Sequence, residues 1–231
     1  MAQLNCGILD NTAKLSLNND TYSHIFETLY APVVKGGMAI YDGYSSDLSK
    51  TGDLVCSTGS SAGILFYGDS ITYADDTIEN VEYNILPYPV FEGGQKIALQ
   101  RGGGLMVAKS NEKKEYAASV FIKWLTSPEQ NMRFISKTGY LPVTKQAFEQ
   151  GMDTHIKNIE DTQIRKMLTT VLSMYESYDL FTAPNFNNFD SVSDNYETNF
   201  KSLMSKQREE YLAGSEVTAK NALVEIKEMN K

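Results

Sequence analysis

Short extended segments occupy the middle of this chain and long helical segments follow them. A buried strand is predicted at Leu54–Cys56, and further strands at Val81–Pro89 and Lys96–Gln100, where short apolar or alternating runs stand beside turn residues. Residues 105–108 are predicted to continue extended. From residue 116 onward, apolar residues recur at three- and four-residue spacing, which is typical of helices that bury one face. Because strands are followed by helices, the sequence predicts an α/β protein rather than an all-α one.

The predicted helices carry their own end signals. A first helix contains the apolar residues from Tyr22 to Tyr30 and ends at Gly36, since glycine is common just past a helix. A second carries the stripe within Tyr116–Leu125. A third begins with Ser127 as N-cap and Pro128 at its first position. The third helix is predicted to run to Gly139, and further helices are predicted near 144–150, 156–176, 190–212 and 216–229.

Two runs of small residues are candidates for backbone that faces a ligand. Ser57–Gly63 follows a predicted strand and precedes a predicted helix, and the first N–H groups of a helix point outward without partners. Arg101–Gly104 lacks the GK[ST] of a P-loop and does not lead into a helix, as a dinucleotide-binding fingerprint would. It is either a bend between strands or a place where backbone approaches a ligand.

Composition excludes some classes of function. The net charge of −8 and the isoelectric point near 4.9 argue against nucleic-acid binding, which needs a basic face. With 231 residues, the chain is one large domain or two small ones. Its two cysteines, Cys6 and Cys56, are predicted to be separate buried thiols, and one disulfide is the alternative.

The sequence offers no motif for catalysis, a metal or a cofactor. His24 and His155 have no metal-ligand neighbours in sequence, and we expect surface or packed histidines. The segment Tyr175–Phe189 mixes aromatic and amide side chains. In a loop this mixture suits sugar binding, because rings cover apolar sugar faces and amides pair with hydroxyls; loop packing is the alternative.

Residues Gly102–Phe148 resemble the family 1 extracellular solute-binding proteins of ABC importers, of the carbohydrate or glycerol-3-phosphate-binding type. The resemblance lies in a glycine-containing strand, the helix pair around KWLTSPEQN and the block TGYLP at Thr138–Pro142. Gly52–Ser61 and Leu212–Ile226 resemble other parts of the same family. Together these segments cover most of residues 50–231.

The resemblance implies an α/β, type II periplasmic-binding-protein-like fold with two lobes that close on a ligand. Residues 1–101 would be the first part of the C-terminal lobe, 102–142 the hinge strand and helices of the N-terminal lobe, and 143–231 a helical return to the C-terminal lobe. Its implied ligand-binding residues are Ser60, Ser61, Gly102, Gly103, Gly104 and Tyr140. Serine hydroxyls, glycine backbone and a tyrosine ring would share the contacts.

The resemblance further implies the partners: a small solute and a membrane permease, with no nucleic acid and no cofactor. Glycerol-3-phosphate binders use an arginine before their last helices, and Ala183–Asn188 contains no arginine or lysine here. A sugar, oligosaccharide or polyol is therefore expected, with glycerol phosphate as the alternative.

The beginning of the chain, MAQLNCGILDN, has no signal-peptide pattern. The resemblance implies that a first lobe and a signal peptide would precede it, so we expect a truncated form of a periplasmic or lipid-anchored protein. By the same analogy, the apolar stripe that includes Trp124 would lie partly uncovered. The competing hypotheses are a glycoside-acting enzyme, which needs two converging carboxylates, and an adaptor domain without a ligand.

Overall fold

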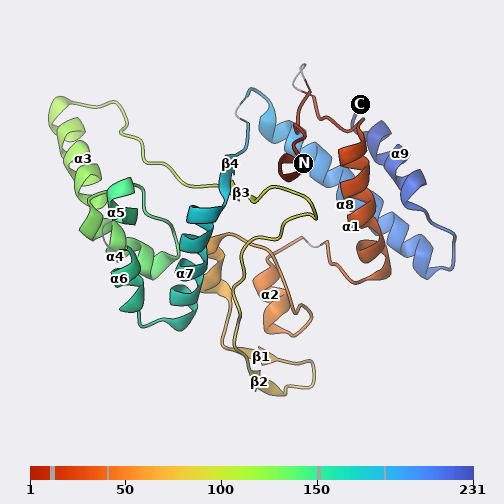
Figure 1. Ribbon diagram of the computed structural model, residues 1–231, viewed down its shortest axis with the longest axis horizontal. Helices are drawn as coiled ribbons and strands as arrows, with labels where there is room; N and C mark the ends of the chain where they lie inside the picture. The colour runs from red at the N-terminus through yellow and green to blue at the C-terminus, as the bar shows by residue number, and fades with distance from the viewer. Residues whose placement is uncertain (11–13, 41, 150–151, 185) are drawn as a thin grey trace. The chain divides into compact units, whose positions relative to one another are not determined.

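The computed structural model describes residues 1–10, 14–40, 42–149, 152–184 and 186–231, and the chain divides into two compact units (Figure 1). Unit 1 consists of Met1–Asp42, Pro89–Gln100 and Asp179–Lys231, and unit 2 of Gly43–Tyr88 and Arg101–Tyr178. Each unit has its own cluster of buried apolar residues. The predicted boundaries at 101/102 and 142/143 refer to the lobes of the family and stay a prediction.

Unit 1 is built on three helices that pack together: α1 (Asp20–Lys35), α8 (Phe189–Leu212) and α9 (Ala219–Met229) (Figure 1). A short 3₁₀ helix, η1 (Ala2–Leu4), begins the chain. The buried core of the three helices unites residues far apart in sequence, namely Leu17, Tyr22, Phe26, Tyr30, Val33, Val34, Leu203, Met204, Ala222 and Ile226. The predicted helices at 190–212 and 216–229 are thus confirmed.

Helix α1 shows how local signals fix its ends. The Asn19 side chain accepts a hydrogen bond of 2.8 Å from the backbone N–H of Tyr22, which satisfies one free donor of the first turn. Gly36 ends the helix in a left-handed conformation, with φ of 86°. Tyr22, Phe26 and Tyr30 then recur every four residues and are buried on one face.

A parallel pair of strands, β3 (Ile97–Gln100) and β4 (Asp179–Thr182), completes unit 1. The buried side chain of Gln3 joins this pair to the segment before it. Its Nε2 donates to the carbonyls of Pro89 and Ile97 at 3.0 and 2.9 Å, and its Oε1 accepts from the backbone N–H of Phe91 at 3.1 Å. The predicted strand at 96–100 is confirmed.

The core of unit 2 is helical. It lies among α4 (Pro128–Thr138), α5 (Lys145–Glu149), α6 (Met152–Lys157) and α7 (Thr162–Ser177). The predicted helix at 156–176 is two helices, because Asp161 caps α7 by accepting from the backbone N–H of Ile164 at 2.9 Å. Ser127 and Gly139 bound α4 as predicted. The buried core residues are Met132, Ile135, Ala147, Met152, Ile156, Ile159, Ile164, Met167 and Leu168.

Shorter elements complete unit 2. They are α2 (Ser45–Lys50), the 3₁₀ helix η2 (Ser61–Phe66), and an antiparallel pair of strands, β1 (Ser70–Thr72) and β2 (Ile78–Asn80). Helix α3 (Glu112–Leu125) confirms a predicted helix, and none of its described residues is buried. The stripe that includes Trp124 is therefore exposed, as expected, with Trp124 at 52%.

Two predicted strands are wrong. Leu54–Cys56 forms no strand and lies at the surface, with Val55 fully exposed, because a three-residue apolar run does not by itself select a buried position. Val81–Pro89 is not paired in a sheet either. Its alternation is real, however: Val81, Tyr83 and Ile85 are half-buried, and the residues between them are exposed.

Side chains of α7 take the place of a neighbouring strand along 81–89. Lys166 Nζ donates to the Tyr83 carbonyl at 3.3 Å, and Thr170 Oγ1 donates to the Ile85 carbonyl at 2.9 Å. Just beyond α7, the Tyr178 hydroxyl donates to the Tyr88 carbonyl at 2.8 Å. These bonds satisfy carbonyl groups that a sheet would otherwise pair.

The extended segment 105–108 also forms no strand, and Met106 is 95% exposed. The cysteines are neither disulfide-bonded nor both buried: Cys6 is half-buried and Cys56 is exposed. In the parts of the chain that the structure describes, no helix is both long and apolar enough to cross a bilayer.

Candidate functional site

Two of the predicted site segments lie against each other in unit 2. Gly139, the C-cap of α4, has φ of +71°, and a Cβ built on it would lie only 2.7 Å from the carbonyl oxygen of Ser61. The same Cβ would lie 3.1 Å from side-chain atoms of Ile64 and Met167. Glycine is required here for both its conformation and its size. The end of α4, which leads into Tyr140, therefore contacts the start of η2.

The groups exposed at this contact are hydroxyls and an aromatic ring. Ser60 precedes η2 and is exposed, and its hydroxyl does not cap the helix. The Tyr140 ring is 46% exposed and lies 5.8 Å from the ring of Phe134, tilted by 44°. An aromatic ring and serine hydroxyls, contributed by two segments in contact, suit a ligand with both apolar and polar surfaces.

The third predicted segment does not join this contact. At Gly102, Gly103 and Gly104, no atom of another described segment lies within 4 Å of the position that a Cβ would take. Among the described residues between β3 and α3 no strand is formed, so the segment is not a bend between two consecutive strands. The role of its backbone in ligand binding stays a prediction.

Hydrogen bonds of Tyr67, which the sequence analysis missed, hold the loop before Ser60. The Tyr67 hydroxyl is hydrogen-bonded to the hydroxyl of Ser45 at 2.9 Å and to that of Ser57 at 2.6 Å. Its ring meets the Tyr83 ring edge-on at 5.3 Å, and the Tyr83 hydroxyl is bonded to Ser49 at 2.8 Å. The only available sequence signal was the number of serines and tyrosines in this region, which does not fix their pairing.

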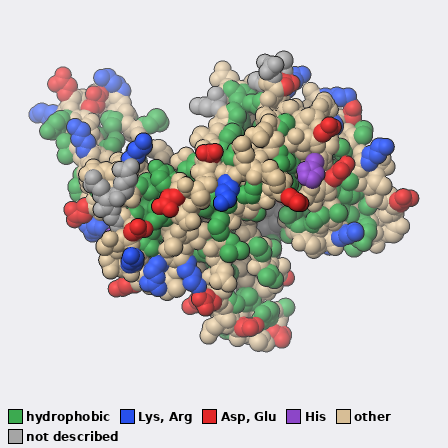
Figure 2. Space-filling model, in the orientation of Figure 1, with side chains coloured by type: hydrophobic (Ala, Val, Ile, Leu, Met, Phe, Trp, Pro, Cys, Tyr) green, Lys and Arg blue, Asp and Glu red, His purple; other side chains and the backbone are tan. Residues whose placement is uncertain are grey.

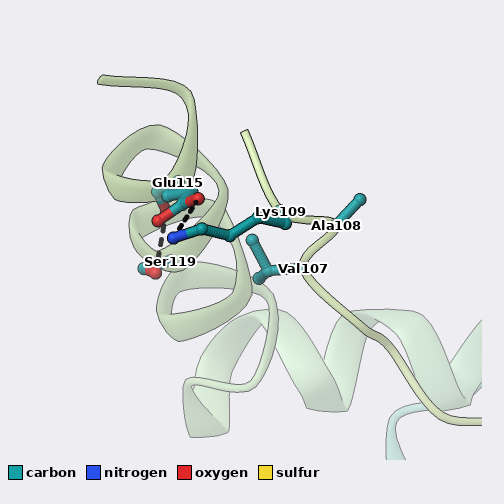
Figure 3. Close-up of a pocket in the computed structure, with 5 residues that line it drawn as sticks. All are labelled: Val107, Ala108, Lys109, Glu115 and Ser119. Atoms are coloured by element: carbon teal, nitrogen blue, oxygen red, sulfur yellow. Dashed lines mark hydrogen bonds and ion pairs between the residues drawn. The ribbon is translucent and has the colours of Figure 1, made fainter. Parts of the chain in front are cut away.

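A hollow of about 330 Å³ beside α3 contains none of the predicted residues. Figure 3 shows Lys109 reaching across it to Glu115, with 3.3 Å between Nζ and Oε1. The same carboxylate accepts from the backbone N–H of Ser110 at 2.7 Å. Both contacts of Glu115 stabilise the first turn of α3. They give this carboxylate a structural role, and the hollow needs no ligand to account for it.

A second hollow, of about 370 Å³, lies among α4, α5 and α6 and is lined by residues that include Arg133 and His155. The Nε2 atom of His155 is buried and has no hydrogen-bond partner among the described residues. His24 is exposed, with its ring 6.2 Å from that of Phe91. No three histidine, cysteine or carboxylate side chains gather as metal ligands within the described ranges.

The predicted aromatic and amide loop at Tyr175–Phe189 is not one loop, because α7, β4 and α8 each take part of it. The Tyr175 ring stacks on that of Phe148 at 4.2 Å, and the Phe186 ring meets Phe189 edge-on at 5.5 Å. These contacts favour the packing alternative. Asn185 of this stretch lies outside the described residues.

Charged side chains show no concentration of one sign on the face drawn in Figure 2, where acidic and basic groups are interspersed. The net charge of −8 argues against nucleic-acid binding, and the absence of a nucleic-acid partner stays a prediction.

Comparison with known proteins assigns the chain to a family. Residues 15–161 match the family described as "Bacterial extracellular solute-binding protein". A similar relative is the sn-glycerol-3-phosphate-binding periplasmic protein UgpB of Brucella abortus (strain 2308), which is 28% identical over 149 residues. The UgpB protein of Rhizobium meliloti (strain 1021) is also 28% identical over 149 residues. The match covers 62% of this chain and 32% of each relative, so the chain spans about a third of the length of these curated relatives.

Two solved structures share the fold. The structure titled "Maltose bound T. maritima MalE3" superposes with a TM-score of 0.62 at 18% identity, covering 96% of this chain and 53% of that one. The cyclic alpha-maltosyl-1,6-maltose binding protein from Arthrobacter globiformis gives 0.59 at 16% identity, covering 99% and 52%. They confirm the predicted α/β, periplasmic-binding-protein-like fold. Because the family match covers more than half of its residues, the chain belongs to the bacterial extracellular solute-binding proteins.

Proposed function

We propose that this chain acts in the substrate-binding component of an ABC importer and captures a sugar, oligosaccharide or polyol. The observation that supports the proposal is the contact between the Ser61 carbonyl and Gly139, because it joins the two segments that contain Ser60, Ser61 and Tyr140. Family membership supplies the context. The proposal assigns binding without chemical conversion of the solute.

The proposal places the protein in the cell envelope, periplasmic or lipid-anchored, where it would deliver its solute to a membrane permease. Ser60, Ser61 and Tyr140 would contact the solute, and Gly102–Gly104 would offer backbone groups to it. Proteins of this kind bind by closing two lobes over a ligand, and such enclosure supplies much of the buried area.

A glycerol phosphate is the second candidate, favoured by the names of the UgpB relatives. Against it, the segment from Tyr44 to Tyr67 contains two aspartates and a single basic residue, Lys50, which lies 4.0 Å from Asp47. Phosphate binding normally draws on guanidinium or several N–H donors. We therefore rank sugars and polyols first.

The test is ligand-dependent melting of this chain and, in parallel, of the longest natural chain that contains it. The panel holds mono- and oligosaccharides, polyols and glycerol phosphates. A ligand present at about 100 times its dissociation constant stabilises the folded protein by roughly 2.7 kcal/mol. A shift with sugars or polyols supports the proposal, and a shift with glycerol phosphates alone replaces its ligand class. Cooperative melting of the longer chain without any shift would contradict it.

A further inference from the structure

We propose that Tyr44 and Phe66 form a stacking subsite for one pyranose ring of a carbohydrate ligand. This inference rests on the proposed function, because it names the class of solute and an additional surface that holds it. The two rings are parallel to within 15°, with 6.5 Å between their centroids. Tyr44 is 78% exposed and Phe66 is 63% exposed. Two large rings are thus aligned on each other while most of their surface faces solvent.

One hydrogen bond, between the residues that follow the two rings in the chain, holds the pair in place. Tyr44 is followed by Ser45, and Phe66 is followed by Tyr67, and the hydroxyls of Ser45 and Tyr67 are bonded at 2.9 Å. Tyr67 is itself fixed, because its ring packs edge-on against Tyr83 at 5.3 Å. Rings whose backbone is already fixed lose little conformational freedom when a ligand stacks on them.

The same contacts connect the ring pair to the predicted site. Tyr67 is bonded to the Ser57 hydroxyl at 2.6 Å, and Ser57 begins the loop that carries Ser60. Ser61 and Phe66 are the two ends of η2, and the Ser61 carbonyl lies against Gly139. The ring pair, the serine hydroxyls and Tyr140 therefore belong to one continuous set of contacts within unit 2.

The chemistry of the region favours a sugar ring as the occupant. A pyranose has a face of C–H groups that covers an aromatic ring and a rim of hydroxyls that pairs with polar groups. Asp47 and Asp53 lie in the chain between the two rings, and Lys50 is the single basic residue there. Carboxylates accept hydrogen bonds from hydroxyl groups and repel phosphates. A glycerol phosphate has no ring to stack, so the pair would contribute nothing to its binding.

The experiment uses Tyr44→Ala and Phe66→Ala in the longest natural chain. Calorimetry measures the affinity for maltose, maltotriose and glycerol 3-phosphate. We expect each variant to raise the dissociation constant of the bound sugar by about tenfold, as loss of a ring contact does. Tyr44→Phe should keep the wild-type affinity within about twofold, because the stacking face remains.

Tyr211→Ala is the matched control, since Tyr211 is an exposed ring on α8 in unit 1. It should leave sugar affinity unchanged. Sugar affinity that is unchanged in both Tyr44→Ala and Phe66→Ala would overturn the subsite and leave the proposed function intact. If the wild-type protein binds neither maltose nor maltotriose, the subsite is overturned. If it also binds no other solute, the proposed function is overturned as well. Unchanged melting temperatures of the variants would show that any loss arises at the binding surface.

Discussion

A ring of unit 1 and a pair of rings in unit 2 lie in opposite environments. In unit 1, Phe26 is buried between rings of its own core, with Tyr30 at 6.0 Å and Phe200 at 6.1 Å. In unit 2, Tyr44 and Phe66 are aligned with each other but exposed. A ring inside a core stabilises the fold through the area it removes from water. An aligned ring that stays in water contributes little to stability, and its surface remains available to a ligand.

The polar tips of the rings differ in the same way. The Tyr22 and Tyr196 hydroxyls of unit 1 are bonded to each other at 3.0 Å, which satisfies two groups within a buried cluster. The Tyr67 hydroxyl of unit 2 is bonded to Ser45 and to Ser57, the first residue of a loop predicted to bind the ligand. Exposure and hydrogen-bond partners therefore separate core rings from the rings that we propose to bind a ligand, whereas residue type alone does not.

The largest effect is expected from Phe26→Ala in unit 1. Phe26 is 1% exposed, and removing a buried ring typically costs about 3–5 kcal/mol of unfolding free energy. Urea unfolding measures the change. Tyr116→Ala on α3, where the ring is 74% exposed, should change stability by less than about 0.5 kcal/mol. Equal losses of unfolding free energy in the two variants would show that buried and exposed rings do not differ in their contribution to stability.

Gly139→Ala tests the contact that joins α4 to η2. An alanine would be strained by its positive φ and would press on the Ser61 carbonyl, so we expect a loss of about 1–3 kcal/mol in stability. Solute affinity should fall as well. Gly37→Ala in unit 1 is the control, because a Cβ there would meet only the Pro32 carbonyl oxygen at an ordinary distance of 3.7 Å. If Gly139→Ala melts and binds like the wild type, the contact does not organise the site.

Tyr140→Ala should weaken solute binding by about 1–2 kcal/mol and leave the melting temperature of the free protein unchanged. The reason is that its ring is half-exposed and removes little area from water in the folded chain. Calorimetry and melting of the same sample separate the two quantities. Tyr140→Phe distinguishes the ring from the hydroxyl. Stability lost without a change in affinity would assign Tyr140 to packing.

The smallest effect concerns alkaline pH. Burial raises the pKa of Tyr22 and of Tyr196 above their ordinary value of 10.0. Burial and the Glu210 carboxylate raise the pKa of Tyr30 as well. Because the folded-state pKa values are raised, stability is full below about pH 10 and declines above it, as the unfolded tyrosines ionise first.

At about pH 10 the expected loss is at most about 0.4 kcal/mol for each of Tyr22 and Tyr196. Urea unfolding at about pH 8 and about pH 10 measures it, and the double variant Tyr22→Phe with Tyr196→Phe should show a smaller decline. A decline of the same size in the double variant would exclude these two rings as its source.

Local signals in the sequence predicted much of the helical structure. Ser127, Pro128 and Gly139 bound α4 as expected, because the ends of a helix depend on residues within one turn of them. The Ser127 hydroxyl donates to the Trp124 carbonyl and does not cap α4. The split between α6 and α7 was missed, although Asp161 is a capping residue. Because Asp161 lies within a continuous pattern of apolar residues, the end of one helix and the start of the next were not recognised.

Strands were predicted less well than helices, because a strand needs a neighbouring strand that the local sequence does not specify. The alternation in Val81–Pro89 correctly indicated which side chains turn inward. It could not indicate that Lys166 and Thr170 of α7 would bind the carbonyls instead of another strand. In the same way, Ser60 and Tyr140 were predicted as site residues, but the ring pair of Tyr44 and Phe66 arises from folding of the chain between them.

The wide spacing of the unit 1 core has a consequence for the order of folding. Helix α1 buries its apolar face against α8 and α9, and β3 pairs with β4, so unit 1 forms through contacts between residues far apart in the sequence. The buried core residues of unit 2 lie between Met132 and Leu168, so their contacts are local. Contacts between distant residues close long loops and form slowly, so we expect the core of unit 1 to form after that of unit 2. Until then, the apolar face of α1 stays in water, where it favours aggregation.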